Sequence, residues 1–169
     1  MHLFDVDMPG KITFRESETL TAGSEFGCFS TPWGHIGLGI CYDLRFPELA
    51  SVLRHERKCE ILVYPGAFNT TTGPIHWELL LRARAVDQQC FVIGAAPAAG
   101  PNGKSDYPVY GHSRILNPMG EVVAQAGSSD ESILYYNLDI KEIKETRRAI
   151  PTSDQKRTDL YSLPVSKLS

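Results

Sequence analysis

The fold of this chain is decided by residues 33–53, which read WGHIGLGICYDLRFPELASVL. Apolar residues alternate with small ones in the first half, which is the period of a β-strand: Ile36, Leu38 and Ile40. The interleaved glycines indicate that another element packs very close to this strand. Apolar residues recur at helical spacing in the second half, after Pro47: Leu49, Val52 and Leu53. The stretch predicts a strand that passes directly into a helix, with Cys41 at the turn and Asp43 as the helix cap.

The rest of the chain continues this alternation of strands and helices. The predicted strands are 61–64, 90–96, 110–116, 121–126 and 132–138, and the predicted helices are 74–88 and 140–148. Residues 1–33 are predicted to be irregular, 97–108 to form a loop, and about 149–169 to form an extended polar tail. Alternating strands and helices followed by a run of strands predict a layered α/β fold.

The composition excludes several classes of protein. The 169 residues include 17 basic and 20 acidic side chains, for a net charge of −3. No excess of positive charge therefore favours nucleic acid or an anionic membrane as a partner. The sequence contains neither an apolar run that could span a bilayer nor a signal peptide. We expect a soluble cytoplasmic protein, with a mitochondrial pool as an alternative.

Four cysteines are spread through the chain without the spacing of a metal site: Cys28, Cys41, Cys59 and Cys90. A chain of this size with ordinary apolar content does not need disulfides. We therefore expect free thiols and no bound metal.

Cys41 is the candidate for chemistry, because a turn after a strand lies at the sheet edge where α/β proteins place reactive groups. Amides at the start of a helix favour the thiolate, and backbone N–H groups there can receive an oxyanion. A nucleophile elbow is excluded because Asp43 occupies the position that requires glycine. A small buried thiol without function, or a pair with His76 or His112, are the alternatives.

The residues around Cys41 belong to a longer series of motifs. In chain order these are HLFD (2–5), PGKITFRES (9–17), GICYDLRFPE (39–48), YPGAF (64–68), TGPIHWE (72–78), RARA (82–85), GHS (111–113) and PMG (118–120). The series resembles the carbon–nitrogen hydrolase (nitrilase) superfamily over nearly the whole chain. The residues of these motifs are most similar to those of the omega-amidase branch. A sister branch that cleaves deaminated glutathione shares most of the motifs.

The resemblance implies an α-β-β-α sandwich that forms a homodimer and uses no cofactor. It implies that Cys41 attacks the terminal amide of a 2-oxo dicarboxylic monoamide, 2-oxoglutaramate or 2-oxosuccinamate. Ammonia then leaves, and water cleaves the thioester to the 2-oxo acid. Glu16 matches the supporting glutamate, and Tyr42 would offer its backbone N–H to the oxyanion. Without the resemblance, Glu16 reads as an exposed loop carboxylate.

Three residues are candidates for the substrate pocket. Arg45 follows the nucleophile by four positions and can bind a substrate carboxylate, or it can pair with Glu48 along the helix. Phe68 and Thr72 match positions that line the family's pocket, with ordinary packing and turn roles as alternatives.

Two groups of the family's pattern are not found in this chain. The lysine that stabilises the oxyanion would fall one residue before Met1, and the general-base glutamate would lie further upstream. We therefore expect 1–169 to be the C-terminal part of a single larger domain and to be inactive or nearly so alone. A non-catalytic fragment that only binds partners is the alternative.

Overall fold

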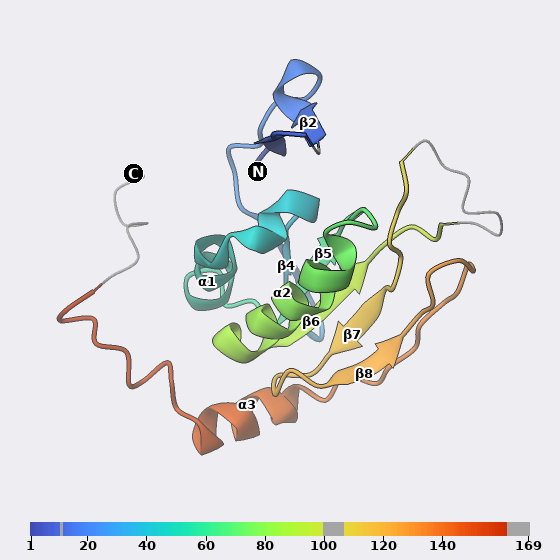
Figure 1. Cartoon of the computed structure of the whole chain (residues 1–169). Helices are drawn as coiled ribbons and strands as arrows, with labels where there is room; N and C mark the ends of the chain where they lie inside the picture. The colour runs from blue at the N-terminus through green and yellow to red at the C-terminus, as the bar shows by residue number, and fades with distance from the viewer. Residues whose placement is uncertain (11, 100–106, 162–169) are drawn as a thin grey trace.

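The computed structural model describes residues 1–10, 12–99 and 107–161 (Figure 1). The strands are β1 (Asp5–Met8), β2 (Ile12–Arg15), β3 (Gly27–Thr31), β4 (Gly34–Leu38), β5 (Ile61–Pro65), β6 (Phe91–Ala95), β7 (Arg114–Leu116) and β8 (Val122–Gln125). The helices are α1 (Pro47–His55), α2 (Gly73–Gln88) and α3 (Ile140–Ala149), with short 3₁₀ turns η1 (Glu16–Glu18) and η2 (Cys41–Arg45). The predicted α/β class is confirmed.

Six strands form the main sheet in the order β3-β4-β5-β6-β7-β8. The central neighbours β4, β5 and β6 are parallel, whereas β3 and the pair β7 and β8 run antiparallel to their neighbours. Helix α1 connects β4 to β5, and α2 connects β5 to β6. Both are crossovers between neighbouring parallel strands that advance in one direction, so right-handed connections place both helices on the same face.

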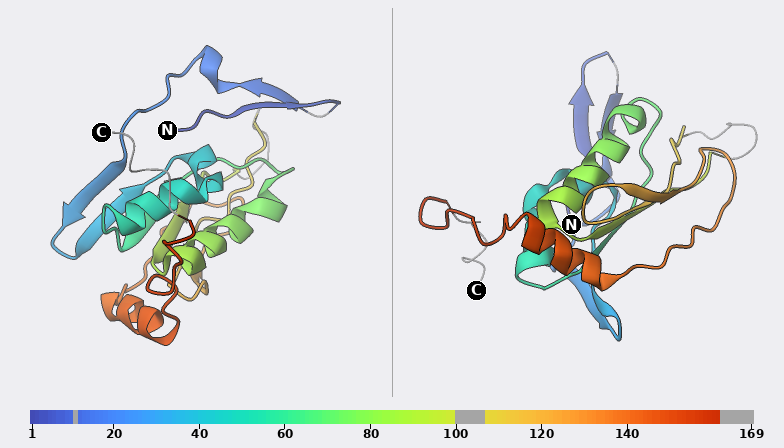
Figure 2. Two further views of the ribbon diagram at one scale, coloured as in Figure 1. Left: turned by 90° about the vertical axis from the view of Figure 1, so that its left-hand side faces the viewer. Right: turned by 90° about the horizontal axis from the view of Figure 1, so that it is seen from below.

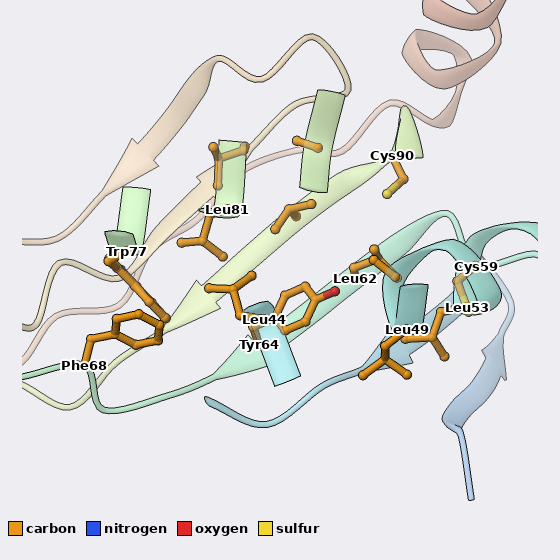
Figure 3. Packing of buried hydrophobic residues seen from close by; sticks show 14 residues of the cluster. Leu44, Leu49, Leu53, Cys59, Leu62, Tyr64, Phe68, Trp77, Leu81 and Cys90 are labelled. Atoms are coloured by element: carbon orange, nitrogen blue, oxygen red, sulfur yellow. The ribbon is translucent and has the colours of Figure 1, made fainter. Parts of the chain in front are cut away.

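The main core lies between this sheet and helices α1 and α2 (Figure 3). Strand β5 contributes Leu62 and Tyr64, and α2 contributes Trp77 and Leu81, all four fully buried. Each of the two leucines contributes roughly 1.5–3 kcal/mol on burial. Strand β4 packs tightly under α1, because a Cβ on Gly37 would lie 2.9 Å from Leu62 and 3.2 Å from Leu53. The glycines of the opening stretch thus have the predicted role.

The opposite face of the sheet is covered by α3, where Ile143 packs with Ile61 and Phe91. Neighbouring side chains on this face, Val63 and Ile93, are only half-buried. Two helices, α1 and α2, pack on the other face, whereas α3 alone packs on this one, so only part of this face is covered. Among the described helices, none has the length and apolar character required to cross a bilayer.

The first 33 residues are more regular than their sequence predicts. Strands β1 and β2 pair antiparallel in a hairpin that lies outside the main sheet (Figure 2), and β3 pairs with β4. The hairpin turns at Pro9-Gly10, where Gly10 has a φ of 73°. The prediction of an irregular start is therefore wrong: each strand is too short, at four or five residues, to show a clear period.

The predicted strand at 132–138 is also wrong, because no strand is assigned there. This segment includes Ile133 and Tyr135, which are 76% and 84% exposed, and no described strand pairs with it. The strand predicted at 61–64 is one residue longer, the other predicted strands are present in shortened form, and the helices predicted at 74–88 and 140–148 are confirmed within two residues. Residues 151–161 form turns, and the rest of the predicted tail lies outside the described residues.

Candidate active site

Cys41 begins the 3₁₀ turn η2, three residues after β4 ends. Its φ of 46° lies in the left-handed region, which residues other than glycine rarely adopt. Two hydrogen bonds close the turn around it. The Asp43 amide donates to the Ile40 carbonyl, and the Ile40 amide donates to Asp43 Oδ2, each at 2.9 Å. These bonds hold the strained residue in place.

Asp43 is not the cap of α1, contrary to the sequence prediction. Helix α1 begins at Pro47, after Phe46, which forms no side-chain cap. Asp43 lies within the turn η2, which ends before that helix, and its carboxylate also faces the N-terminal segment. It accepts hydrogen bonds from the His2 amide and His2 Nδ1, both at 2.8 Å, and from the Met1 nitrogen at 3.0 Å.

The Asp43 carboxylate is only 2% exposed. Burial by itself raises its pKa, but the hydrogen bonds from His2 and Ile40 outweigh burial and keep the pKa below its usual range. The group is therefore ionised at neutral pH, and it ties residues 1 and 2 to the nucleophile turn.

Residues after β5 meet Cys41 at the same edge of the sheet. Since β4 and β5 are parallel neighbours, their carboxyl ends lie side by side. Gly66 makes the approach possible: a Cβ there would lie 3.0 Å from Cys41 Cα and 3.4 Å from Trp77. Cys41 and Ala67 consequently line one small pocket, which the remaining members complete: Phe4, Tyr42, Arg45, Phe68, Asn69, Thr72 and Tyr107.

Burial is the main influence on the Cys41 thiol and raises its pKa. The charge of Glu16 raises the pKa further, whereas the backbone amides of Ala67 and Tyr42 and the charge of Arg45 lower it. The net effect is upward, so the thiol is protonated at neutral pH and requires a base to become a nucleophile. Two amide N–H groups close to the sulfur are the kind of donors that stabilise an oxyanion.

Glu16 begins η1, directly after β2, and is half-buried. Its Oε2 accepts a hydrogen bond of 2.7 Å from the Phe4 amide. The carboxylate therefore fixes the segment before β1 and also influences the nucleophile electrostatically. It is not the freely exposed loop carboxylate that its sequence context alone favours.

The Arg45 guanidinium lies in the pocket rather than on the outer face of α1. Its Nη1 donates to His76 Nδ1 at 3.2 Å, and its carbon lies 4.9 Å from the centre of the Phe68 ring. No hydrogen bond or ion pair joins Arg45 to Glu48 among the described residues, so the alternative of a helix ion pair is wrong. Arg45 is placed where it can meet an anion beside Cys41.

Phe68 and Thr72 both line the pocket, and each also has a structural role. The Phe68 side chain is 6% exposed, and its ring centre lies 5.0 Å from that of Trp77. The Thr72 hydroxyl and amide both donate to Asn69 Oδ1, which fixes the turn before α2.

Histidine does not activate the thiol in this structure. His76 contacts Arg45, and the His112 ring lies 4.3 Å from the Tyr110 ring. Neither forms a hydrogen bond with Cys41 among the described contacts. Within the same residues, no group of three or more His, Cys, Asp or Glu side chains could hold a metal ion.

Comparison with known families identifies the fold around this pocket. The pattern of the family described as Carbon-nitrogen hydrolase matches residues 1–148. The chain belongs to the carbon-nitrogen hydrolase family. The resemblance of the motifs to that superfamily is thereby confirmed.

Relatives within the carbon-nitrogen hydrolases include proteins named Omega-amidase NIT2. The chain is 54% identical to the Bos taurus protein over 99% of its own length and 59% of that relative. It is 51% identical to the Danio rerio protein over 96% of its length and 57% of that relative. The chain thus spans somewhat less than three fifths of the length of these relatives.

Solved carbon-nitrogen hydrolase structures have the same fold. Saccharomyces cerevisiae Nit3, a member of branch 10 of the nitrilase superfamily, matches with a TM-score of 0.78 and 44% identity. That match covers 92% of this chain and 52% of Nit3. The C. elegans NitFhit protein matches with a TM-score of 0.81 and 40% identity, over 96% of this chain and 39% of its own.

The sequence does not predict the roles of three residues at this carbon-nitrogen hydrolase site. Ala67 contributes its amide, His76 contacts Arg45 instead of Cys41, and the Tyr107 hydroxyl donates to the Ala67 carbonyl at 3.1 Å. The Pro-Gly pair after β5 is the one local signal that could have indicated Ala67, since glycine marks a close backbone approach.

Proposed function

We propose that this chain carries the nucleophile and the substrate-carboxylate site of an omega-amidase. The substrate class is a 2-oxo dicarboxylic monoamide such as 2-oxoglutaramate or 2-oxosuccinamate. One observation carries the proposal: Cys41 and a half-buried arginine without a carboxylate partner among the described residues line the same pocket. A monoamide presents the matching pair of groups, a scissile amide and a free carboxylate. The relatives named omega-amidase support this choice of chemistry.

In the first half of the reaction the Cys41 sulfur attacks the amide carbon while its proton passes to a general base. A C–S bond forms, and the amide oxygen becomes an oxyanion, for which we assign the Tyr42 and Ala67 amides as donors. The C–N bond then breaks, the nitrogen takes up a proton, and ammonia leaves behind a thioester. In the second half water attacks the thioester, the C–S bond breaks, and the 2-oxo acid and the thiol are released.

The described residues supply only part of this machinery. Glu16 influences the thiol, but its Oε2 already accepts the Phe4 amide, so we assign it the supporting role. None of the described lysines lines the pocket. Since this chain spans 59% of a relative's length, we propose that the base and an oxyanion-stabilising lysine belong to the part of the domain that lies outside residues 1–169. Since one oxyanion donor is worth roughly 3–4 kcal/mol, activity should depend strongly on both groups.

Ammonia release from 2-oxoglutaramate tests the proposal. The full-length protein should release ammonia, Cys41→Ala should abolish the release, and the isolated 169-residue chain should be far slower. Comparable turnover by the isolated chain would contradict the assignment of the missing groups. Faster hydrolysis of deaminated glutathione would assign the protein to the sister branch instead. No turnover by the full-length protein on either amide would favour the alternative that the protein is non-catalytic and only binds partners.

We also propose that the active protein is a homodimer in which α2 takes part. Apolar side chains on the outer side of α2 are exposed: Ile75 at 61%, Leu79 at 62% and Val86 at 51%. Exposed apolar clusters of this kind are typical of interaction surfaces. Leu79→Glu should convert the dimer to a monomer in light scattering, and an unchanged mass would refute this assignment.

The four free cysteines support a proposed location in a reducing compartment, the cytoplasm or the mitochondrial matrix.

A further inference from the structure

Arg45 is held by an unusual set of neighbours for a half-buried cation. A buried arginine is normally paired with a carboxylate, because an unpaired charge away from water is costly. Arg45 has no such partner among the described residues, and its one hydrogen bond there is the 3.2 Å contact with His76 Nδ1. Aromatic rings supply the other contacts, with ring centres at 4.9 Å for Phe68 and 5.9 Å for Tyr42.

The chemistry of the two side chains assigns the protonation state of His76. Arginine has only donors and stays protonated, so His76 Nδ1 must be the acceptor. The imidazole is therefore neutral and carries its proton on Nε2. His76 itself is fixed on the first turn of α2, where its backbone amide donates to the Thr72 carbonyl at 2.9 Å. The contact thus connects the nucleophile turn to the start of α2.

Phe68 is a second neighbour that constrains the guanidinium. Phe68 cannot move freely, because it is buried against Trp77. The Phe68 ring and the contact with His76 together restrict the position of the Arg45 guanidinium in the pocket. A guanidinium has five N–H groups in a planar fork, so most of its donors remain available to an anion in that position.

We infer that His76 is a positioning residue that orients Arg45 for the free carboxylate of the substrate. The inference rests on the proposed function and adds the residue on which selectivity for a charged substrate depends. His76 does not contact the reacting atoms, so its replacement should change the preference for anionic reagents rather than the reactivity of Cys41. A neutral reagent should be almost unaffected.

Alkylation of Cys41 tests this without requiring turnover. Iodoacetate and iodoacetamide both form a C–S bond at the same carbon and release iodide, but only iodoacetate carries a carboxylate. The ratio of their rate constants at Cys41, measured by peptide mass spectrometry, reports how well Arg45 is presented. The exposed Cys28 provides an internal reference in the same sample.

Two variants of similar polarity separate positioning from packing. His76→Asn keeps an acceptor where Nδ1 lies, whereas His76→Gln places it near the position of Nε2. We expect the ratio at Cys41 to fall about tenfold in His76→Gln, equivalent to ~1.4 kcal/mol. It should stay within about threefold of the unmodified protein in His76→Asn, and the ratio at Cys28 should not change. Thermal melts confirm that each variant is folded.

An unchanged ratio in His76→Gln, or an equal fall in both variants, would overturn the inference. Arg45→Gln provides the reference for complete loss of the anion preference. If the ratios behave as expected but no amide is hydrolysed, the proposed function fails and the positioning role stands. If the amide is hydrolysed but the ratio of rate constants at Cys41 does not change when His76 is replaced, the positioning role alone fails.

Discussion

The substitution Asp43→Asn tests how the nucleophile turn is held. Both carboxylate oxygens accept hydrogen bonds: Oδ1 accepts from the His2 amide and ring, and Oδ2 accepts from the Ile40 amide. An asparagine has one acceptor oxygen and an NH₂ group. In one orientation the NH₂ group would face the Ile40 amide, and in the other it would face the His2 amide, so at least one donor loses its acceptor.

The expected cost follows from these bonds. A hydrogen bond to a charged group contributes about 1.5–3 kcal/mol, so the loss of one lowers the free energy of unfolding by about that amount. That is a large part of the 5–15 kcal/mol that stabilises an ordinary domain. For a protein of this size it lowers the melting temperature by about 3–12 °C.

Urea unfolding of the full-length protein, followed by circular dichroism at neutral pH, measures this difference. Glu131→Gln is the matched control, because this exposed carboxylate has no partner among the described residues, and it should change stability by less than about 0.5 kcal/mol. The pKa of Asp43 is held below its usual 3.8, so its stabilising effect is complete at neutral pH. It is lost as pH falls through the lower folded-state value, and the deficit of the variant should shrink there. A deficit below about 1 kcal/mol at neutral pH would refute this account of the turn.

Three further predictions concern the thiol, a histidine and a glycine. Burial and then the Glu16 charge raise the pKa of Cys41, so its alkylation by iodoacetamide should begin at higher pH than that of a small free thiol. Glu16→Gln should shift the pH dependence of this alkylation, followed by mass spectrometry, to lower pH. An unchanged pH dependence would contradict the influence of Glu16 on the thiol. Burial, then Lys156 and Arg54, lower the pKa of His55 to about 4, so stability should fall as pH drops from about 6.5 toward 4. Solvent screening reduces this loss to about 1–2 kcal/mol. The difference between the urea unfolding midpoints at pH 7 and pH 5 should therefore be much smaller in His55→Gln. Gly66→Ala should destabilise the protein by about 1–3 kcal/mol and slow alkylation of Cys41, since the added Cβ lies 3.0 Å from Cys41 Cα; normal stability and reactivity would show that the turn yields easily.

Much of the architecture follows from local patterns. The alternation in β4, the glycine that admits α1 and the helical spacing after Pro47 all concern neighbours within a few positions. These patterns place Cys41 at a strand-to-turn junction without any knowledge of the fold. Where a period is too short, as in β1 and β2, or where pairing needs a partner strand, as at 132–138, the same reasoning fails.

The amino-acid order alone therefore specifies the α/β class, the family motifs and the identity of the candidate nucleophile, because periodicity and turn chemistry are local properties. Only the tertiary structure determines what surrounds that nucleophile. Asp43 meets His2 across 41 positions, and Arg45 meets His76 across 31. No pattern within a short window encodes such contacts. The second arises because the parallel strands β4 and β5 bring the turns that follow them to one edge of the sheet, and the first because the N-terminal segment packs against the nucleophile turn. The choice of Arg45 between Glu48 and the pocket was settled in this way, by packing rather than by spacing.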